Sequence, residues 1–489
     1  MHSRYLLPPV AIDEKSMLIK FIPNRTALLA ALALLATGCA VGPNYQRPTT
    51  PDVATFKEAE GWVAAAPADA LERGPWWQLF GDPALNDLAA RVEVSNQNVA
   101  AAVAAYAQAR ALVSQQNAAL FPSASLNGGL SRSARVGDNY QLSVGGAWAP
   151  DIWGRLGRVV DGATANAAAS AADLASAKLS AQGALAVNYL SLRQQDAQLA
   201  LLGTTITGYM RTLEITQNRY AAGISAKTDL LQAQTQLANA KAQEAGLQRQ
   251  RAQFEHAISV LVGEVPGNFA LKALAVWKPV VPEVPVSVPS TLLQRRPDIA
   301  AAERRVAAAN EQIGITRSAY YPSLSLNASA GTGASRVGDL FMASSSLWSL
   351  GLSAAQVLFD AGATGARVEG AQAAQTQAVA LYRQTVLSAF RDVEDQLAAT
   401  RFLLTQQQLS GEASAAADQV EQQLLNRYRS GQVSYTEVIT AQTTALNARI
   451  ALGQALANRQ TTAVALIQSL GGGWHSGQQI ECGLIMLLN

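Results

Sequence analysis

The sequence predicts an α+β membrane protein in which one structural unit occurs twice. Residues 99–127 align without a gap on residues 299–327, and each stretch is a small-residue helical pattern that ends in an aromatic-Pro-Ser step and an alternating run. Further along, residues 218–223 (NRYAAG) recur as residues 426–431 (NRYRSG). Each copy of such a repeat is one supersecondary unit that buries its apolar face against its neighbour. We therefore expect a tandem duplication in which helix, β-hairpin and helical hairpin follow one another twice.

The composition excludes several classes of function. The 489 residues carry a net charge of +2 and only 15% are charged, so no basic field favours nucleic acid as a partner. Cysteine is limited to Cys39 and Cys482, and the three histidines are scattered singly. These residues are too few and too far apart for a tetrahedral metal site or a disulfide framework, and we expect no cofactor.

Residues 1–38 have the organisation of a signal peptide. Lys20 and Arg25 form a basic region, and residues 27–35 (ALLAALALL) form an apolar core that is too short to span a bilayer. A small-residue cleavage site follows and ends at Cys39. We therefore predict that Cys39 is a lipoprotein cysteine, acylated by fatty acids such as palmitate. An ordinary secretory signal with an incidental cysteine is the alternative, and the true start is either Met1 or Met17.

A proline-rich segment precedes the first predicted helix. Proline recurs without a period between residues 43 and 75. Such a stretch does not form a core element, so we expect residues 39–82 to be an extended, lipidated segment along the outside of the body. Asp82 then supplies a helix cap, followed by Pro83 at the first helical position. From Pro83 the pattern predicts one helix of nearly forty residues, to about Leu120.

The rest of each copy is predicted to be a long helical hairpin. Proline is absent from residues 151–265 and again from residue 323 onward, while Ala, Gln and Leu dominate. The absence of the strongest helix breaker over such long runs indicates long helices. Gly223 and Gly431 interrupt the runs, as glycine does just past a helix end. We expect helical arms of about 35 to 60 residues that pack through narrow apolar stripes, as in coiled coils.

These signals divide the chain into six segments. The predicted boundaries are 1–38 for the signal peptide, 39–82 for the extended segment, 83–265 for the first repeat with its β-hairpin at 122–149 and helical tip near 223, 266–296 for a proline-rich linker, 297–474 for the second repeat with its β-hairpin at 322–357 and tip near 431, and 475–489 for a tail. We have no interpretation of the tail.

Four runs depart from the helical period and alternate between apolar and small polar residues. They are residues 123–131, 140–148, 324–329 and 348–353. Strands with one apolar face, one polar face and aromatic residues at the ends are typical of membrane barrels. A half-buried hairpin of a soluble protein has the same pattern, so each run alone leaves both interpretations open.

Four strands are too few to close a barrel in a membrane. Open strand edges carry unpaired backbone groups that lipid cannot satisfy, and single-chain barrels begin at about eight strands. If the hairpins enter a bilayer, the chain must therefore associate with further copies of itself. The membrane interpretation predicts a homo-oligomer.

The chain resembles the TolC-like outer-membrane factor family, and within it the lipid-anchored NodT/OprM-like branch that works with RND pumps. The matching motifs, in family order, are residues 38–45 (GCAVGPNY), 76–83 (WWQLFGDP), 296–299 (RPDI), 321–324 (YPSL), 359–362 (FDAG) and 470–474 (LGGGW). The resemblance implies a homotrimer whose twelve strands form one barrel in the outer membrane, continued by a helical barrel across the periplasm. It also implies a periplasmic adaptor and an inner-membrane RND pump as partners, and Ala40 after the cysteine points to the outer membrane.

The resemblance also implies roles for the helical tips. The tip turns, at Tyr220, Gly223, Tyr428 and Gly431, would contact the adaptor. The family closes its periplasmic mouth with acidic residues just past the second turn, where this sequence has Glu437 and Thr440. Asp229 is the first-copy counterpart of Glu437. Residues 434–437 also form a capping box, so helix capping is the competing interpretation of Glu437.

No catalytic constellation is present in the sequence, and we expect no enzyme. It has no Gly-x-Ser-x-Gly elbow and no phosphate loop, and His256 has no second ligand at metal-binding spacing. The predicted function is a passive outer-membrane conduit of a tripartite efflux system that exports drugs or other small molecules. The alternative is a lipid-anchored periplasmic coiled-coil scaffold without a channel.

Overall fold

The computed structural model describes residues 41–49, 56–58, 75–135, 137–274, 276–284 and 296–472. The predicted signal peptide, the lipidation of Cys39 and the predicted tail lie outside these residues. The chain forms two compact units, which we describe separately. A sheet unit contains the described parts of residues 41–42, 122–157 and 317–358, and a helical unit contains the described parts of 43–121, 158–316 and 359–472.

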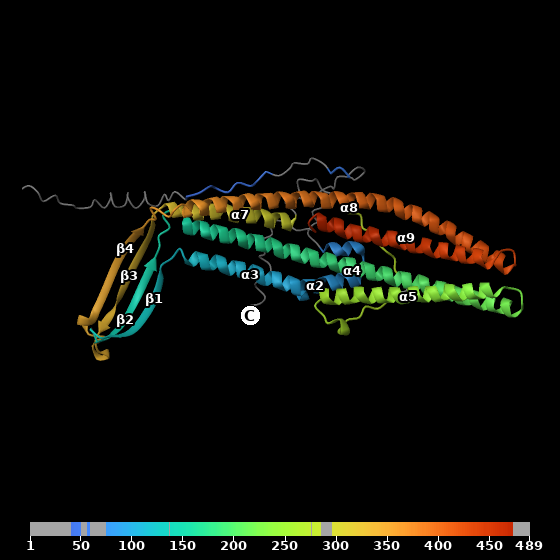
Figure 1. Ribbon diagram of the computed structural model, residues 1–489, viewed down its shortest axis with the longest axis horizontal. Coiled ribbons are helices and arrows are strands. Elements are labelled where there is room, and N and C mark those ends of the chain that lie inside the picture. Colours follow the sequence, from blue (N-terminus) through green and yellow to red (C-terminus); the bar gives the residue numbers. More distant parts are fainter. Residues whose placement is uncertain are drawn as a thin grey trace, which may run out of the picture. The chain divides into compact units, whose positions relative to one another are not determined.

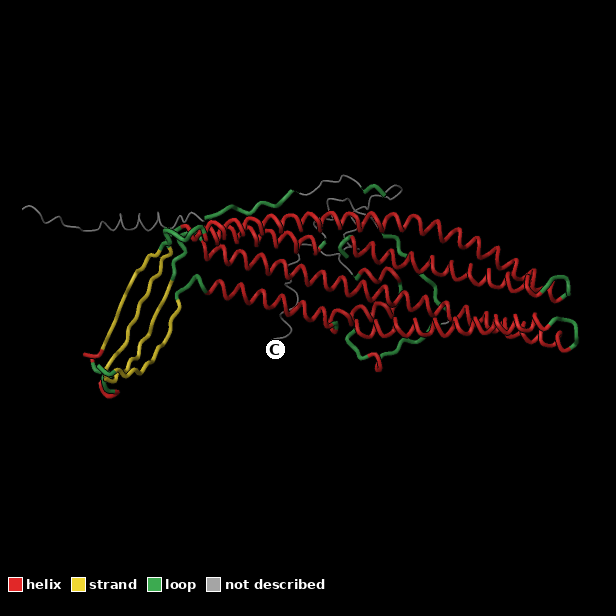
Figure 2. The backbone as a smooth tube through the Cα atoms, viewed as in Figure 1, coloured by secondary structure: helices red, strands yellow, loops and turns green. Residues whose placement is uncertain are grey.

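The sheet unit is built from two hairpins, one from each copy of the repeat. Its antiparallel strands are β1 (Ser123–Ser133), β2 (Gly137–Trp148), β3 (Ser323–Ala334) and β4 (Ser346–Ala355), which lie side by side in the order β1-β2-β3-β4 (Figure 2). All four predicted strands are confirmed. Each of them is longer than its alternating run. The second hairpin loop contains two short turns, η4 (Val337–Asp339) and η5 (Ala343–Ser345).

The strand register keeps one face of the sheet apolar across both hairpins. Leu126 is opposite Val144, Trp148 is opposite Leu326, and Leu326 is opposite Leu352. The other face carries small polar residues, and hydroxyls meet across it at 2.7 Å between Ser325 and Ser353 and 2.8 Å between Ser329 and Ser349. Because side chains alternate along a strand, this register extends the predicted alternation over the whole sheet.

The helical unit contains two hairpins of matched length. The elements are η1 (Trp76–Phe80), α2 (Pro83–Ser95), α3 (Gln97–Ala118), α4 (Arg155–Ala221), α5 (Lys227–Leu261), η2 (Pro266–Asn268), α7 (Pro297–Arg317), α8 (Ala363–Arg429) and α9 (Tyr435–Ser469) (Figure 1). The short η3 (Ser318–Tyr320), which follows α7, belongs to the sheet unit. Helices α4 and α8 have 67 residues each, and α5 and α9 have 35 each. The equal lengths agree with a tandem duplication, although the longer arms exceed the predicted range. In the part of the chain that the structure describes, no helix has the length and apolarity to cross a membrane.

The prediction of one helix from Pro83 to about Leu120 is wrong. The helix ends at Ser95 and a second begins at Gln97, because Asn96 adopts an extended conformation. The buried Asn96 side chain accepts hydrogen bonds from the N–H groups of Asn98 and Val99 at 3.0 and 3.1 Å. Its amide also donates to the Leu261 carbonyl at 2.8 Å. Asn96 thus caps α3 and ties the break to the end of α5.

The main apolar core joins both copies of the repeat. Its fully buried members include one or more residues from each of α2, α4, α5, α7, α8 and α9, namely Leu85, Leu185, Leu192, Ile258, Ile299, Leu397 and Leu466. Phe56, Trp76, Trp77 and Phe80 also belong to this core. The prediction that residues 39–82 lie only along the outside is therefore wrong at these four aromatic residues, since their apolar area is buried rather than solvated.

The described parts of the N-terminal segment are attached to helices of both copies. The Pro43 carbonyl accepts from Arg158 at 3.2 Å and from Asn310 at 3.1 Å, and the Tyr45 hydroxyl donates to Glu303. Farther along, Glu394 accepts the N–H groups of residues 57 and 58 at 2.7 and 2.9 Å. Glu394 of α8 thus anchors a segment that lies more than 300 residues earlier in the sequence.

Candidate functional site

The two helical tips have the same backbone geometry, and both turns lie at one end of the helical unit (Figure 1). Gly223 and Gly431 have φ of 69° and 75°, which are left-handed values that glycine adopts without steric cost. Beside them, Ile224 N–H donates to the Arg219 carbonyl at 2.8 Å, and Gln432 N–H donates to the Arg427 carbonyl at 2.9 Å. This pattern is a Schellman motif in each copy. The glycines lie where the sequence places them.

The side chains at the two tips differ although the motif is the same. Tyr428 is only 3% exposed, whereas its counterpart Tyr220 is 41% exposed. The Tyr428 ring packs against Tyr435, with ring centroids 5.4 Å apart, and Val438 and Ala233 complete a small buried cluster. The tyrosine of the second tip therefore lies in a small core that includes Ala233 of α5, while the tyrosine of the first tip is partly open to solvent.

Arg219 joins the two tips. Its guanidinium lies 5.0 Å from the centre of the Tyr428 ring and donates to the Tyr428 carbonyl at 3.3 Å. The buried Thr216 hydroxyl lies 3.5 Å from the Tyr428 hydroxyl. Burial raises the pKa of the neighbouring Tyr435, and the negative charge of Asp229 acts in the same direction. The end of α8 is thus held against α4 by a cation–π contact and hydrogen bonds.

The residues predicted to contact an adaptor differ in their exposure to solvent. Tyr220, Gly223 and Gly431 are exposed at the tips. The Tyr428 side chain is buried within the chain, so its ring packs the tip and is not part of the exposed surface. Contact of the two turns with an adaptor stays a prediction, with Tyr220 as the accessible tyrosine.

Glu437 lies in the first turn of α9 and is exposed. Its carboxylate accepts from both the N–H and the hydroxyl of Ser434, each at 3.1 Å. The capping interpretation is therefore confirmed. The exposed Thr440 donates to the Thr436 carbonyl at 3.0 Å, and Asp229 is half-buried in the first turn of α5. A gate role for Glu437, Thr440 or Asp229 is not tested by these contacts.

Replacing Tyr428 by alanine should lower the free energy of unfolding by about 3 kcal/mol, because a large buried ring leaves a cavity. The same change at Tyr220 should cost about 0.5 kcal/mol or less, because that ring is partly solvated. Chemical denaturation of the two variants in detergent, followed by helical circular dichroism, measures both values. Equal losses at the two positions would contradict the asymmetry between the tips.

A network of buried charged side chains is centred on Asp196 of α4. It was not predicted from the sequence. The Asp196 side chain is completely buried and pairs with Arg193 at 2.9 Å and Arg251 at 2.7 Å. It also accepts the N–H of Leu274 at 3.2 Å, and Arg193 donates to the Lys272 carbonyl at 2.9 Å. An acid and a base three residues apart in an otherwise uncharged stretch were the available signal. The network fixes the chain after α5 onto α4.

Tyr189 and Asp82 extend this network to the first helix. The Tyr189 hydroxyl donates to Asp82 at 2.7 Å and accepts from Arg193 at 3.0 Å. Burial, followed by the hydrogen bond to Asp82, raises the pKa of Tyr189 above its usual range. Asp82 also caps α2 through the N–H of Ala84 at 2.9 Å. The cap predicted from the Asp-Pro step therefore has a second partner in α4.

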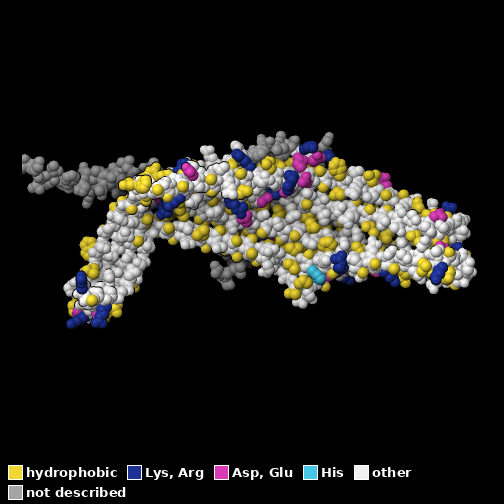
Figure 3. All heavy atoms as spheres, viewed as in Figure 1, with side chains coloured by type: hydrophobic (Ala, Val, Ile, Leu, Met, Phe, Trp, Pro, Cys, Tyr) yellow, Lys and Arg dark blue, Asp and Glu magenta, His cyan; other side chains and the backbone are white. Residues whose placement is uncertain are grey.

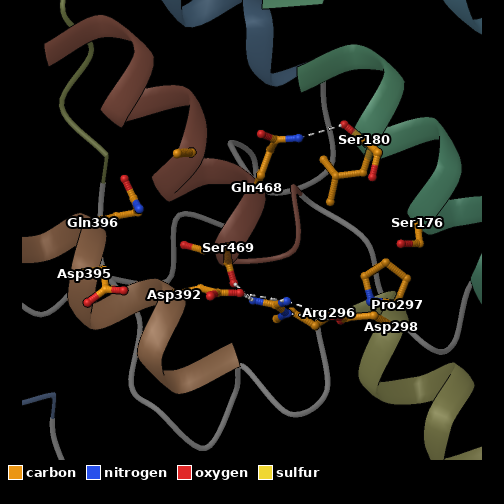
Figure 4. A pocket seen from close by; sticks show the side chains of 12 residues that line it. Ser176, Ser180, Arg296, Pro297, Asp298, Asp392, Asp395, Gln396, Gln468 and Ser469 are labelled. Carbon is orange, nitrogen blue, oxygen red and sulfur yellow. Dashed lines mark hydrogen bonds and ion pairs between the residues drawn. The ribbon is translucent and has the colours of Figure 1, made fainter. Parts of the chain in front are cut away.

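Arg296 makes a similar junction at the start of the second copy. Figure 4 shows it between Asp298, Asp392 and Ser469. It pairs with Asp298 at 2.7 Å and Asp392 at 3.4 Å, and donates to the Ser469 carbonyl at 3.3 Å. Burial lowers its pKa, but the two aspartates outweigh burial and raise the pKa above its ordinary value. A cavity of about 340 Å³ beside it is lined by these paired groups, which join α7, α8 and the end of α9.

The sheet faces and the remaining surface carry few charges. Figure 3 shows that hydrophobic and uncharged polar side chains cover most of the visible face. On the apolar face of the sheet, Leu126, Leu350 and Leu352 are about 70% exposed within the single chain. An exposed apolar surface of this kind is found where a protein meets lipid or another protein. Among the described residues, no group of His, Cys, Asp and Glu could hold a metal ion.

Comparisons of the sequence and of the structure with known proteins both match outer-membrane proteins of efflux systems. The model of the outer membrane efflux protein family matches residues 88–264 and 288–472. The probable efflux pump outer membrane protein TtgC of Pseudomonas putida is 30% identical over 462 residues, which cover 91% of this chain and 95% of TtgC.

Solved structures share the fold over most of the chain. The outer-membrane channel OprN has a TM-score of 0.79 at 29% identity, covering 89% of this chain and all (100%) of OprN. The open state of the MtrE outer membrane channel of Neisseria gonorrhoeae has a TM-score of 0.80 at 26% identity, covering 90% of this chain and 100% of MtrE. The chain therefore belongs to the outer membrane efflux protein family, whose members are channel proteins of efflux systems and not enzymes.

Proposed function

We propose that three copies of this chain form a conduit through the outer membrane, which carries small molecules from the periplasm or a pump to the exterior. The observation that carries the proposal is the four-stranded sheet. One face of the sheet is apolar and the other is polar in both hairpins. Within the chain, the edge strands β1 and β4 each pair with only one other strand. Edge strands in lipid need partners, and twelve strands from three copies would supply them.

Protein partners are proposed at the two helical tips. The exposed turns at Gly223 and Gly431 would meet a periplasmic adaptor, which connects the conduit to an inner-membrane RND pump. Cys39 would attach each copy to the outer membrane through its acyl chains. The family membership favours this conduit over a periplasmic scaffold without a channel, and export would be driven by the pump because the sequence has no phosphate-binding loop.

Conductance of the purified protein in a planar bilayer tests the conduit. We expect discrete channels from the detergent-extracted oligomer. A folded oligomer that never conducts would support the scaffold instead. The genes beside the coding sequence provide an independent check, because a neighbouring pump and adaptor would fix the transport class.

Replacing Glu437 by alanine tests the proposed gate. Three carboxylates that meet on a three-fold axis would repel one another or bind a cation, so their removal should raise the leak conductance of the closed channel. The loss of the capping contact should cost about 1 kcal/mol or less and leave folding intact. Single-channel recording with and without divalent ions measures the leak conductance. An unchanged leak conductance would mean that Glu437 only caps the helix. Ser434→Ala, which also removes a capping group, is the matched control.

A further inference from the structure

A large cavity opens between α4, α5 and α9. It has a volume of about 780 Å³, which lies within the range of small-molecule sites. Seven of the twelve side chains that line it are amides, two are hydroxyls, and none is charged. Gln194 and Gln195 come from α4, Gln250 and Phe254 from α5, and Gln454 from α9. Amide side chains from three helices thus gather in one cavity, and they can hydrogen-bond to a ligand that carries many polar groups.

Two of these amides have polar atoms without a partner in the chain. Gln194 is 5% exposed, and its buried Nε2 donates a hydrogen bond to no protein acceptor. The buried Oε1 of Gln195 likewise accepts no hydrogen bond from a protein donor. Gly453 of α9 faces the Gln194 amide, and a Cβ there would lie only 2.9 Å from Nε2. Buried polar groups are normally paired, so unpaired ones in a cavity mark a place for a ligand or water.

The cavity is separated from the charges of the same helix. Residues 188, 191 and 195 follow helical spacing on the side of α4 that lines the cavity. Tyr189, Arg193 and Asp196 follow the same spacing on another side, where they form the buried charge network described above. The wall of the cavity is therefore uncharged, although the buried charged side chains of Arg193 and Asp196 lie on the same turns of α4.

We infer that this cavity binds neutral, hydroxyl-rich solutes, for which an oligosaccharide is the fitting class. A hydroxyl both donates and accepts a hydrogen bond, and an amide side chain does the same through two different atoms. The half-buried ring of Phe254 offers an apolar surface for the C–H groups of a sugar ring.

Other ligand classes fit the lining less well. An inorganic cation such as calcium prefers carboxylates, and none lines the cavity. A purely apolar solute would displace water from the amides without pairing them. Placement of the cavity in the wall of the conduit rests on the proposed function, whereas binding of the sugar does not.

Maltotriose is a suitable probe for the full-length protein in a detergent without a sugar headgroup. Saturation-transfer NMR and calorimetry should detect its binding. Replacing Gln194 by leucine should weaken the affinity at least tenfold, because a buried donor is lost from the site. The thermal midpoint of this variant should not fall, because Nε2 makes no bond within the chain that the change could break.

Gln442→Leu is the matched control, since Gln442 is also buried on a long helix with an unpartnered Oε1 but does not line this cavity. It should bind maltotriose as the parent protein does. Absence of binding by the parent protein, or equal binding by Gln194→Leu, overturns the inference. Conductance is measured separately: binding without channels supports this inference and contradicts the proposed conduit, whereas channels without binding do the reverse.

Discussion

Replacing Asp196 by alanine is expected to lower the free energy of unfolding by about 3–5 kcal/mol, the usual cost of removing one partner from a buried ion pair. The Asp196 carboxylate is fully buried and lies 2.9 Å from Arg193 and 2.7 Å from Arg251. Without it, two guanidinium groups that are largely removed from water lose their counter-charge. The Leu274 N–H, at 3.2 Å from the carboxylate, loses its acceptor as well.

Chemical denaturation in detergent, followed by helical circular dichroism, measures this loss. Asp173→Ala is the matched control on the same helix, because Asp173 pairs with Arg305 at 2.6 Å but both side chains are about half exposed, at 46% and 54%. Exposed pairs contribute about 1 kcal/mol or less, so the control should unfold almost as the parent protein does. A similar small loss for Asp196→Ala would mean that the two arginines find other partners.

Replacing Leu126 by arginine is expected to prevent most of the protein from entering the membrane. Leu126 is 71% exposed on the apolar face of β1 and lies opposite Val144. An arginine on the lipid face of a membrane barrel costs about 2–4 kcal/mol near the midplane, and in an assembly of identical copies the cost recurs in each one. We expect the strands of the variant to stay outside the bilayer, so that the variant forms no conducting channels.

Asn127→Arg provides the control, because residue 127 is next in the strand and points to the polar face. This variant should insert normally and change the conductance or ion selectivity, since its charge would face the conduit. The fraction of each protein that resists alkaline extraction from membranes measures insertion, and bilayer recording measures conductance. If both variants insert equally well, the apolar face does not contact lipid and the proposed conduit fails.

Local features of the fold could be predicted because their causes lie within a few residues. The alternation in β2 needs only neighbouring residues, and the register then places those side chains on common faces. The positive φ of Gly223 and Gly431 follows from a helix that must turn back. The Ser434 and Glu437 contacts are three residues apart, so the sequence contains both partners of the capping box.

Features with distant partners could not be predicted in the same way. The break at Asn96 depends on the Leu261 carbonyl, which is 165 residues away. Asp196 bonds to Arg251 and Leu274, at separations of 55 and 78 residues. Nothing in the local pattern says that these segments meet, because helical periodicity reports which side of a helix is apolar and not which segment covers it.

The sequence by itself determined that the chain is a duplicated unit of helix, hairpin and long helices, since repeats and periodicity are properties of residue order. Both tips carry the same Asn-Arg-Tyr motif, and this motif does not indicate which of the two tyrosines is buried. Only the tertiary structure decided that Tyr428 is buried and Tyr220 exposed. The physical reason is that burial depends on the neighbours that fold against a side chain: Tyr428 packs against Arg219 and Tyr435, and the latter position is Lys227 in the first copy.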